Sequence, residues 1–489
     1  MKSTTKKSGI GRRRGASKKQ SLQTSLLVSI VAFSVTFLII IGCYLGHMSR
    51  KTQIDASMEM LKDMPFVDRT NKYLKKRHAR DSADAGQTKP KSTRGDVKSR
   101  IDQYINDVKL GPILKSQVHL FDVDLSRLKP SSSSPGGYTG AKALFCKLNW
   151  DLHKYDPPKY PMFRFLVSES GCNNSDNIIK VDIASLMDKV REYDEMMEAE
   201  AQSKHVDDIK GYAHVMPPSG FVFHESRVGS TLVANSLAAM DPEAHRVFSE
   251  STPINVALQV CENQGEGCDM EMAANFFRDL VYLMGRTNSP AEKHLFFKVS
   301  SAGTKRMKVM REAFPNTPWI FVYRNPVQTM MSHLDPSKIG RSTDHIMAVC
   351  TKARRHPPDD LIELVKDAGR DIKEISDIEF CAAHLNSLCE SALIELRKSS
   401  TGKAVEYDGL VEKLISDVIP NHFGVEMTDK GEENIREVSK TYSKNKGAKD
   451  PVWTEDSEKK EKRASKAIVD ASEFFMKKSY QELQTFTSV

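Results

Sequence analysis

The 489-residue sequence lacks the features that would direct it to several common functional classes. Its net charge of +8 resides in residues 1–20, which hold eight basic and no acidic residues; the other 64 basic residues are balanced by 64 acidic ones. An excess confined to a tail does not predict a nucleic-acid-binding surface, so we expect no nucleic-acid partner. The cysteine spacings do not fit a zinc site, so no metal is expected, and no internal repeat is present.

Charged residues are also missing from residues 20–49, and Leu26–Leu45 is dominated by Leu, Ile, Val and Phe. About 20 such residues suffice to span a bilayer. Because basic residues concentrate before this run, the positive-inside rule predicts a cytosolic tail (1–25), a transmembrane helix (26–46) and a luminal remainder. The alternative is a cleaved signal peptide, but the apolar run is long for one and no clear cleavage site follows.

Seven of the eight cysteines, all but Cys43, would then lie in an oxidising compartment. An odd number leaves Cys350 or another unpaired, and spacing alone does not fix connectivity. The sequence Asn173-Asn174-Ser175 is an N-glycosylation sequon, consistent with a luminal surface loop. The plausible local cysteine pairs are Cys146 with Cys172, Cys261 with Cys268, and Cys381 with Cys389.

Composition divides the remaining chain into three parts. Residues 47–110 are polar and charge-mixed, which is typical of a stem or linker; the alternative is a solvated helix that belongs to the domain. Residues 111–210 predict a small β-rich accessory region that ends in an amphipathic helix over 184–201. Residues 211–489 form the expected catalytic domain. The accessory strands are predicted at Val118–Phe121, Ala143–Cys146 and Phe163–Val167.

The catalytic domain is organised around Gly220–Met240, which reads as strand, tight loop and helix. Apolar Phe221–Phe223 suits a buried parallel strand. The apolar spacing after Gly229 predicts a helix with Ser230 or Thr231 as its cap. Backbone N–H groups at a helix start have no intrahelical partners, and the helix dipole favours negative charge. The stretch therefore predicts an anion site.

Arg227 adds a guanidinium to this loop, and that group suits phosphate or sulfate. The ATP-binding pattern G-x-x-x-x-G-K-[ST] is not met, because no Lys follows Gly229. Instead, R-x-G-S-T-L resembles the 5′-phosphosulfate loop of sulfotransferases, which share the P-loop fold and use 3′-phosphoadenosine 5′-phosphosulfate (PAPS). It is most similar to the membrane-bound tyrosylprotein-sulfotransferase-like branch, where Arg replaces the Lys of cytosolic enzymes. The alternative is an ordinary strand–helix turn with a surface arginine.

A second motif follows Trp319–Tyr323, another run suited to a buried strand. Arg324 and Pro326 come directly after it, and proline suits the first turn of a helix. This resembles the 3′-phosphate motif of sulfotransferases, an Arg-x-Pro with a serine eight residues beyond the arginine, here Ser332. Arg324 can hold a phosphate bidentately, and Ser332 can donate from two turns further along the helix. The alternative for Arg324 is a structural ion pair.

Two further strands carry the candidate catalytic residues. A strand over His245–Phe248 leads to Glu250, and a carboxylate at the end of a parallel strand beside an anion loop suits proton abstraction. The resemblance implies the same role, at a slightly different spacing from Arg227. Lys298 lies in the apolar run Leu295–Ser301, where an unpaired lysine is costly to bury. The resemblance implies that it binds the bridging oxygen or the sulfuryl group; the alternatives are a surface glutamate and an edge-strand lysine.

The C-terminal half is read mainly as helix. Residues 303–314, 343–400 and Lys459–Leu483 have helical patterns, and Lys403–Tyr407 resembles a late strand of the family. The loop Lys444–Gly447 weakly resembles the nucleotide loop of sulfotransferases, and a solvated basic loop is the alternative.

Strands alternating with helices from about 215 to 430 predict an α/β domain with a P-loop-like, mainly parallel sheet flanked by helices. The resemblance implies PAPS-dependent transfer of a sulfuryl group to a carbohydrate or tyrosine hydroxyl. It also implies a type II glycoprotein of the Golgi membrane with its catalytic domain in the lumen. The alternatives are a P-loop kinase-like enzyme and a non-catalytic membrane-anchored binding protein. A glycosyltransferase also fits the topology, but its one D-x-D candidate is Asp122-Val123-Asp124 in the β-rich region, where a surface turn explains it better. The implied site consists of Arg227, Gly229, Ser230 and Thr231 on the 5′-phosphosulfate, Arg324 and Ser332 on the 3′-phosphate, Glu250 as the base, and Lys298 with Arg227 on the leaving oxygen.

Overall fold

The computed structural model describes residues 94–203, 213–261, 268–334, 348–441, 443–444, 452 and 456–487. The predicted tail, the predicted transmembrane helix and most of the predicted stem lie outside these residues. None of the described helices is both long enough and apolar enough to cross a bilayer.

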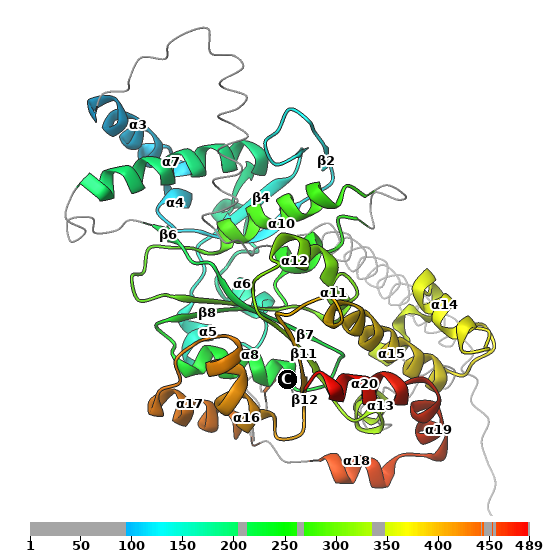
Figure 1. Ribbon diagram of the computed structural model, residues 1–489. Helices are drawn as coiled ribbons and strands as arrows, with labels where there is room; N and C mark the ends of the chain where they lie inside the picture. The colour runs from blue at the N-terminus through cyan, green and yellow to red at the C-terminus, as the bar shows by residue number, and fades with distance from the viewer. Residues whose placement is uncertain are drawn as a thin grey trace, which may run out of the picture. The chain divides into compact units, whose positions relative to one another are not determined.

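A five-stranded parallel sheet forms the centre of the structure (Figure 1). Its strand order is β12-β11-β7-β10-β8, so the strand that precedes the predicted anion loop lies in the middle. The predicted α/β class with a parallel sheet is confirmed. The bounds are β7 Pro218–His224, β8 His245–Ser249, β10 His294–Lys298, β11 Trp319–Tyr323 and β12 Gly402–Glu406.

Helices cover both faces of this sheet, because alternate residues of each strand point to opposite sides. Phe221 and Phe223 of β7 belong to one buried cluster with α10 and α12, whereas Val222 belongs to another with α8 and α17. A strand buried on both faces explains the continuous apolar runs in the sequence. The helices that follow or cover the strands are α8 Ser230–Met240, α9 Thr252–Ala257, α10 Met270–Met284, α11 Ser301–Thr304, α12 Met307–Ala313, α13 Pro326–Leu334, α16 Leu410–Lys413, the π-helix η5 Leu414–His422 and α17 Asp429–Ser439.

The segment before β7 is an antiparallel three-stranded sheet with helices, and it shares the larger buried cluster with the central sheet. Its strand order is β1-β4-β5. The long helix predicted over 184–201 is present as α7. The elements are α3 Arg94–Asn106, α4 Leu110–Leu114, β1 His119–Asp124, β2 Lys129–Pro130, β3 Tyr138–Thr139, β4 Lys142–Cys146, α5 Asp151–Tyr155, α6 Phe163–Glu169, the 3₁₀ helix η1 Ser175–Asn177, β5 Ile179–Asp182, α7 Ile183–Ser203 and β6 His214–Val215. Strand β6 pairs with the short strand β9 Arg286–Thr287, which follows α10 in the chain.

One predicted strand of this segment is wrong, because Phe163–Val167 lies within helix α6. Phe163 and Leu166 are both buried, and a spacing of three residues places them on one helix face. Phe163 and Phe165 alternate with Arg164 in a way that also fits a strand, so the pattern alone did not distinguish the two structures.

The C-terminal half is largely helical, as predicted. The single helix expected over 303–314 is instead two short helices, and the C-terminal helix expected over 459–483 is three. The remaining bounds are the 3₁₀ helix η4 Val349–Arg355, α14 Asp359–Asp367, α15 Asp377–Leu396, α18 Ser457–Arg463, α19 Lys466–Phe475 and α20 Lys477–Thr485.

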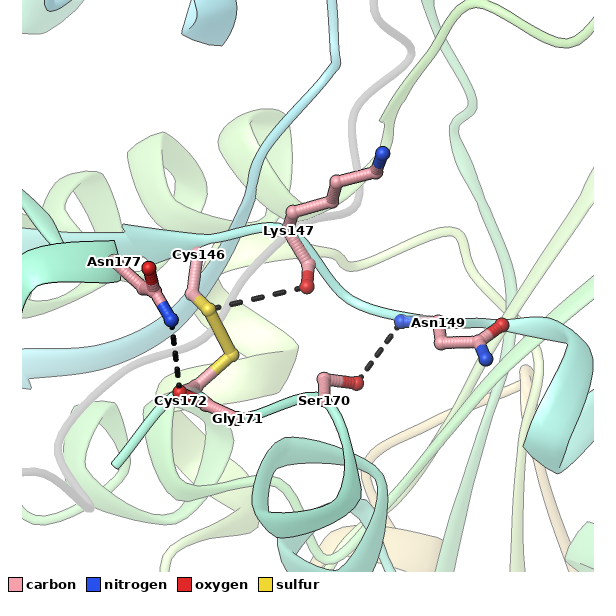
Figure 2. Close-up of a disulfide and its surroundings, with 7 residues drawn as sticks. All are labelled: Cys146, Lys147, Asn149, Ser170, Gly171, Cys172 and Asn177. Carbon is pink, nitrogen blue, oxygen red and sulfur yellow. Dashed lines mark hydrogen bonds between the residues drawn. A yellow bond between two sulfur atoms is a disulfide. The ribbon is translucent and has the colours of Figure 1, made fainter. Parts of the chain in front are cut away.

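Two of the three plausible cysteine pairs are disulfides, Cys146–Cys172 (Figure 2) and Cys261–Cys268. The third pairing is wrong: Cys381 bonds to Cys350, and Cys389 is a buried free thiol. Eight residues of α15 separate Cys381 from Cys389, a rise of about 12 Å along the helix, which is too far for a disulfide.

Candidate functional site

The two predicted arginine loops lie at the same edge of the central sheet. Strands β7 and β11 are parallel neighbours, and His224 at the end of β7 pairs in register with Val322 of β11. Arg324 follows β11 directly, and Arg227 lies in the loop after β7. The carboxyl ends of parallel strands meet at one edge, where α/β proteins bind their ligands.

The loop after β7 turns sharply into α8. Gly229 is the residue before the helix and has a φ of 84°, a left-handed conformation that favours glycine. The predicted cap by Ser230 or Thr231 is wrong, because both residues lie inside the first turn of α8 and no side chain caps it. Both hydroxyl-bearing side chains are buried beside the free N–H groups of that turn.

Backbone strain marks two of the predicted site residues. Among the described non-glycine residues, positive φ occurs at Ser116, Arg227 (58°) and Glu250 (51°). Left-handed backbone is unfavourable for residues with a Cβ, and such conformations cluster at ligand-binding and catalytic positions. Arg227 is exposed, so its guanidinium is open to a ligand at this edge.

The Tyr407 ring lies between the two arginine loops. It follows β12, and its backbone N–H donates to the Tyr323 carbonyl at 2.8 Å. The Arg324 guanidinium carbon is 4.0 Å from the ring centroid, within the range of a cation–π contact. A Cβ placed on Gly229 would lie 2.7 Å from the same ring. The two loops are therefore packed against one side chain, and a residue larger than glycine would not fit at position 229.

Arg324 is buried and already holds protein partners in the described structure. Its Nε donates to Gln328 Oε1 at 2.6 Å, and one terminal nitrogen donates to Ser457 Oγ at 2.6 Å. The Asp456 carboxylate lies 3.5 Å away. Ser332 lies two turns along α13, where its hydroxyl donates to the Gln328 carbonyl at 2.9 Å. The Ser332 hydroxyl oxygen can still accept a hydrogen bond, but its proton is already donated to the Gln328 carbonyl.

Glu250 and Lys298, predicted from separate strands, are in direct contact. Lys298 Nζ donates to Glu250 Oε1, and the backbone N–H of Glu250 donates to the Lys298 carbonyl at 2.7 Å. Burial raises the pKa of Glu250, but the Lys298 ammonium, the nearby His224 and the hydrogen bond outweigh it and lower that pKa to about 2. Lys298 is 1 % exposed, so the pair satisfies a charge that would otherwise be costly to bury.

Three further residues complete the surroundings of Glu250. Arg164 Nη1 of α6 lies 3.9 Å from Glu250 Oε2, and His224 Nε2 lies 4.0 Å from Oε1. Lys444 lies within electrostatic range of Glu250 and Lys298; burial and the Lys298 charge lower its pKa to about 8. The sequence pattern weakly indicated Lys444, whereas Arg164 and His224 carried no signal, because tertiary packing alone brings them to Glu250.

Two more buried titratable groups lie beside the arginine loops. Burial raises the pKa of Glu225 well above its ordinary value, although the Arg324 backbone N–H and charge oppose this shift. His333, next to Ser332 on α13, has neither ring nitrogen hydrogen-bonded. Burial, with the nearby Arg227 charge, lowers the pKa of His333 to about 3, so its ring is neutral.

Within the described ranges, no group of three or more His, Cys, Asp or Glu side chains has a geometry that could hold a metal ion. The site is instead rich in fixed cations around one carboxylate. Such an arrangement can bind a multiply charged anion and, at Glu250, accept a proton.

Comparisons with known proteins give distant structural neighbours, among them three sulfotransferase structures. No family model and no curated protein matches the chain. A sulfotransferase domain from the curacin biosynthetic pathway is 12 % identical over 56 % of this chain and 99 % of its own, with a TM-score of 0.27. A sulfotransferase domain of the Synechococcus PCC 7002 olefin synthase is 13 % identical over 56 % of this chain and 96 % of its own, with a TM-score of 0.26. A Mycobacterium avium sulfotransferase is 11 % identical over 72 % of this chain and 88 % of its own, with a TM-score of 0.27. A likeness this low does not assign the chain to a family.

Proposed function

We propose that this chain transfers the sulfuryl group of PAPS to the hydroxyl of a carbohydrate or of a protein tyrosine. The observation that carries the proposal is the juxtaposition of two arginine loops on adjacent parallel strands, packed on one tyrosine ring, beside a lysine–glutamate pair. A nucleotide with a phosphate at each end of its ribose needs two separate anion sites on one sheet edge. The tyrosylprotein-sulfotransferase-like loop sequence supports a place in that branch.

We assign the residues of the two loops to the two phosphate groups of the nucleotide by their positions. Arg227 and the first turn of α8, with Ser230 and Thr231, would hold the 5′-phosphosulfate, and Arg324 with Ser332 would hold the 3′-phosphate. Binding at Arg324 requires it to exchange Asp456 or Ser457 for the phosphate. Because an ionised phosphate only accepts hydrogen bonds, Ser332 must likewise turn its hydroxyl from the Gln328 carbonyl to the phosphate.

Glu250 would accept the proton of the acceptor hydroxyl as that oxygen attacks sulfur. Lys298 and Arg227 would stabilise the negative charge that develops on the oxygen leaving sulfur. Positioning and fixed charges of this kind carry most of the catalysis in the related phosphoryl transfers.

The proposed location is the Golgi lumen, with the chain anchored as a single-pass type II membrane protein. The apolar run before residue 46 supports an anchor. The disulfides Cys146–Cys172, Cys261–Cys268 and Cys350–Cys381 support an oxidising compartment, and the exposed Asn173 supports a glycosylated surface. Protease protection and glycosidase sensitivity of the chain in intact microsomes test this location.

Thermal unfolding of the purified full-length chain tests the nucleotide preference. We expect 3′-phosphoadenosine 5′-phosphate (PAP) to raise the melting temperature clearly, and ATP and UDP to have little effect, because ligands stabilise the state that binds them. Equal or larger shifts with ATP or UDP would contradict the proposal and favour a kinase-like or glycosyltransferase function.

Substitution of the lysine–glutamate pair separates an enzyme from a binding protein. We expect Glu250→Gln and Lys298→Ala each to lower sulfuryl transfer by about 100-fold or more while PAP binding persists. Lys293→Met, which removes an exposed lysine next to the start of the same strand, is the matched control and should leave transfer unchanged. PAP binding without transfer in the parent chain would identify a binding protein.

A further inference from the structure

The accessory segment reaches the proposed catalytic residue through α6. Phe163, the first residue of this helix, packs on Phe248 of β8 with 5.2 Å between ring centroids, and Trp150 packs on Phe248 edge-to-face at 5.0 Å. Ser249 Oγ donates to Met162 Sδ at 3.7 Å. These contacts fix the start of α6 against the end of β8, next to Glu250.

Arg164, the second residue of α6, contacts the Glu250 oxygen that Lys298 does not. Its Nη1 is 3.9 Å from Oε2, whereas Lys298 Nζ contacts Oε1. The two cations differ in exposure: the Arg164 side chain is 52 % exposed and the Lys298 side chain 1 %. The Arg164 guanidinium carbon also lies 4.9 Å from the Phe165 ring centroid, which limits its freedom.

The proposed reaction makes two demands on Lys298. It pairs with Glu250 in the described structure, yet it is also expected to stabilise charge on the oxygen leaving sulfur. When Lys298 turns to that oxygen, Oε1 loses its partner, and a carboxylate without a partner can rotate or become protonated. A second cation on Oε2 removes this conflict.

We infer that Arg164 is a positioning residue that holds the Glu250 carboxylate ionised and oriented while Lys298 serves the sulfuryl group. This inference rests on the proposed function. It also gives the accessory segment a role in the active site, because the sheet and its crossover helices do not supply this guanidinium.

The other groups that face Glu250 do not replace Arg164. His224 on β7 is neutral near pH 7, because burial and the Lys298 charge lower the pKa of its ring well below 6.5. Lys444 loses charge near pH 8. Arg164 Nη1 lies 3.9 Å from Oε2, whereas His224 Nε2 and Lys298 Nζ lie against Oε1, so Arg164 is placed on the other oxygen of the carboxylate.

The Cys146–Cys172 disulfide closes the segment that carries α5 and α6 (Figure 2). Within the same loop, the Asn149 backbone N–H donates to Ser170 Oγ at 2.9 Å. The position of Arg164 is therefore fixed by contacts on β8 at one side and by a covalent closure at the other.

Carboxyl labelling of Glu250 tests the inference without an identified acceptor. The full-length chain, with and without PAP, is treated at pH 5.5 with a carbodiimide and glycine ethyl ester, and labelling of Glu250 is measured by peptide mass spectrometry. Carbodiimides react with the protonated carboxyl, so losing a half-exposed cation partner should raise the labelling rate by about threefold to fivefold in Arg164→Gln. Arg164→Lys should stay within about twofold of the parent.

Lys159→Met is the matched control, because it removes an exposed cation from the same disulfide-closed loop. We expect its labelling to equal that of the parent chain. Equal labelling in Arg164→Gln and the parent would overturn the inference. Equal increases in Arg164→Gln and Arg164→Lys would also overturn it, because they would indicate a packing role instead of a charge.

Turnover supplies the second readout and separates the two proposals. With PAPS and an acceptor that the parent chain sulfates, Arg164→Gln should lower kcat about tenfold and leave the KM for PAPS within twofold. An unchanged kcat, or a loss seen only in KM, would overturn the positioning role. Failure of PAP to stabilise the parent chain would contradict the proposed function, whereas the labelling result would still decide whether Arg164 controls Glu250.

Discussion

At the scale of single residues, the site couples several cations through one carboxylate. Lys444 is the member whose charge changes nearest to neutral pH, because burial and the charge of Lys298 lower its pKa from 10.5 to about 8. Glu250 opposes this shift, and Arg227 adds to it. A bound phosphate would favour the charged form of Lys444, so nucleotide affinity should depend on pH in this range.

We predict that PAP affinity falls about fivefold between pH 7 and pH 9.5, a size typical of one partly exposed ion pair. The second ionisation of a phosphate monoester has a pKa of about 6, so the charge of PAP changes little there and a fall in affinity reports a protein group. Without ligand, the sign is opposite: the unfolded chain binds more protons between pH 8 and 10.5, so the free energy of unfolding should rise with pH. Calorimetric titration of the parent chain and of Lys444→Met with PAP, at pH 7 and at pH 9.5, measures the change in affinity. Lys444→Met should bind PAP more weakly at pH 7, and its affinity should not change with pH. If its affinity fell with pH as steeply as that of the parent chain, Lys444 would not be the cause of the pH dependence.

At the scale of secondary-structure elements, helix α18 lies against the predicted 3′-phosphate site. Asp456 and Ser457 at its start contact Arg324, and Glu461 accepts from Gln328 Nε2 at 2.6 Å. A carboxylate 3.5 Å from the arginine occupies space and charge that a phosphate would need. The start of α18 therefore competes with the proposed ligand.

We predict that Asp456→Asn tightens PAP binding by about threefold to tenfold. The substitution removes a negative charge that would repel the 3′-phosphate, and at a half-exposed site such a charge changes the binding free energy by about 1 kcal/mol. Calorimetric titration against PAP and against adenosine 5′-phosphate measures the effect. The gain should be confined to PAP, because adenosine 5′-phosphate has no 3′-phosphate. Glu458→Gln, on the same helix but paired with Lys462, is the control. Equal gains in affinity for PAP and adenosine 5′-phosphate would show that Asp456 does not act on the 3′-phosphate.

The inner strands β7 and β11 of the central sheet could be predicted from the sequence because they are buried on both faces. Phe221–Phe223 and Trp319–Tyr323 are continuous apolar runs, a pattern typical of strands buried in a parallel sheet. Short amphipathic segments are harder: α6 satisfies both a two-residue and a three-residue spacing, and its contact with Phe248 decides between them. The contacts of Arg164 and Tyr407 have no local signal, since their partners lie more than 80 residues away in sequence.

At the scale of the whole molecule, buried ion pairs join the accessory segment to the central domain. Arg286 of β9 is buried and contacts Asp194 of α7, and Tyr282 of α10 donates to the same carboxylate at 2.5 Å. Arg286 also donates to the Leu114 carbonyl at 2.9 Å. Elements from both sides thus share one polar network within one hydrophobic core, which favours cooperative unfolding.

We predict that Asp194→Ala lowers the free energy of unfolding by about 3–5 kcal/mol, because it leaves the Arg286 charge buried without its carboxylate partner. Asp124→Ala is the matched control, since it breaks the more exposed pair with Lys180 in the same segment and should cost at most about 1 kcal/mol. Urea unfolding, monitored by hydrogen exchange in peptides from α7 and from β11, measures both the loss of unfolding free energy and the cooperativity of unfolding. In the parent chain the two sets of peptides should lose protection at the same urea concentration. If α7 opened first with β11 still protected, the accessory segment would be a separate folding unit, and Arg164 would be held at Glu250 only while that unit stayed docked.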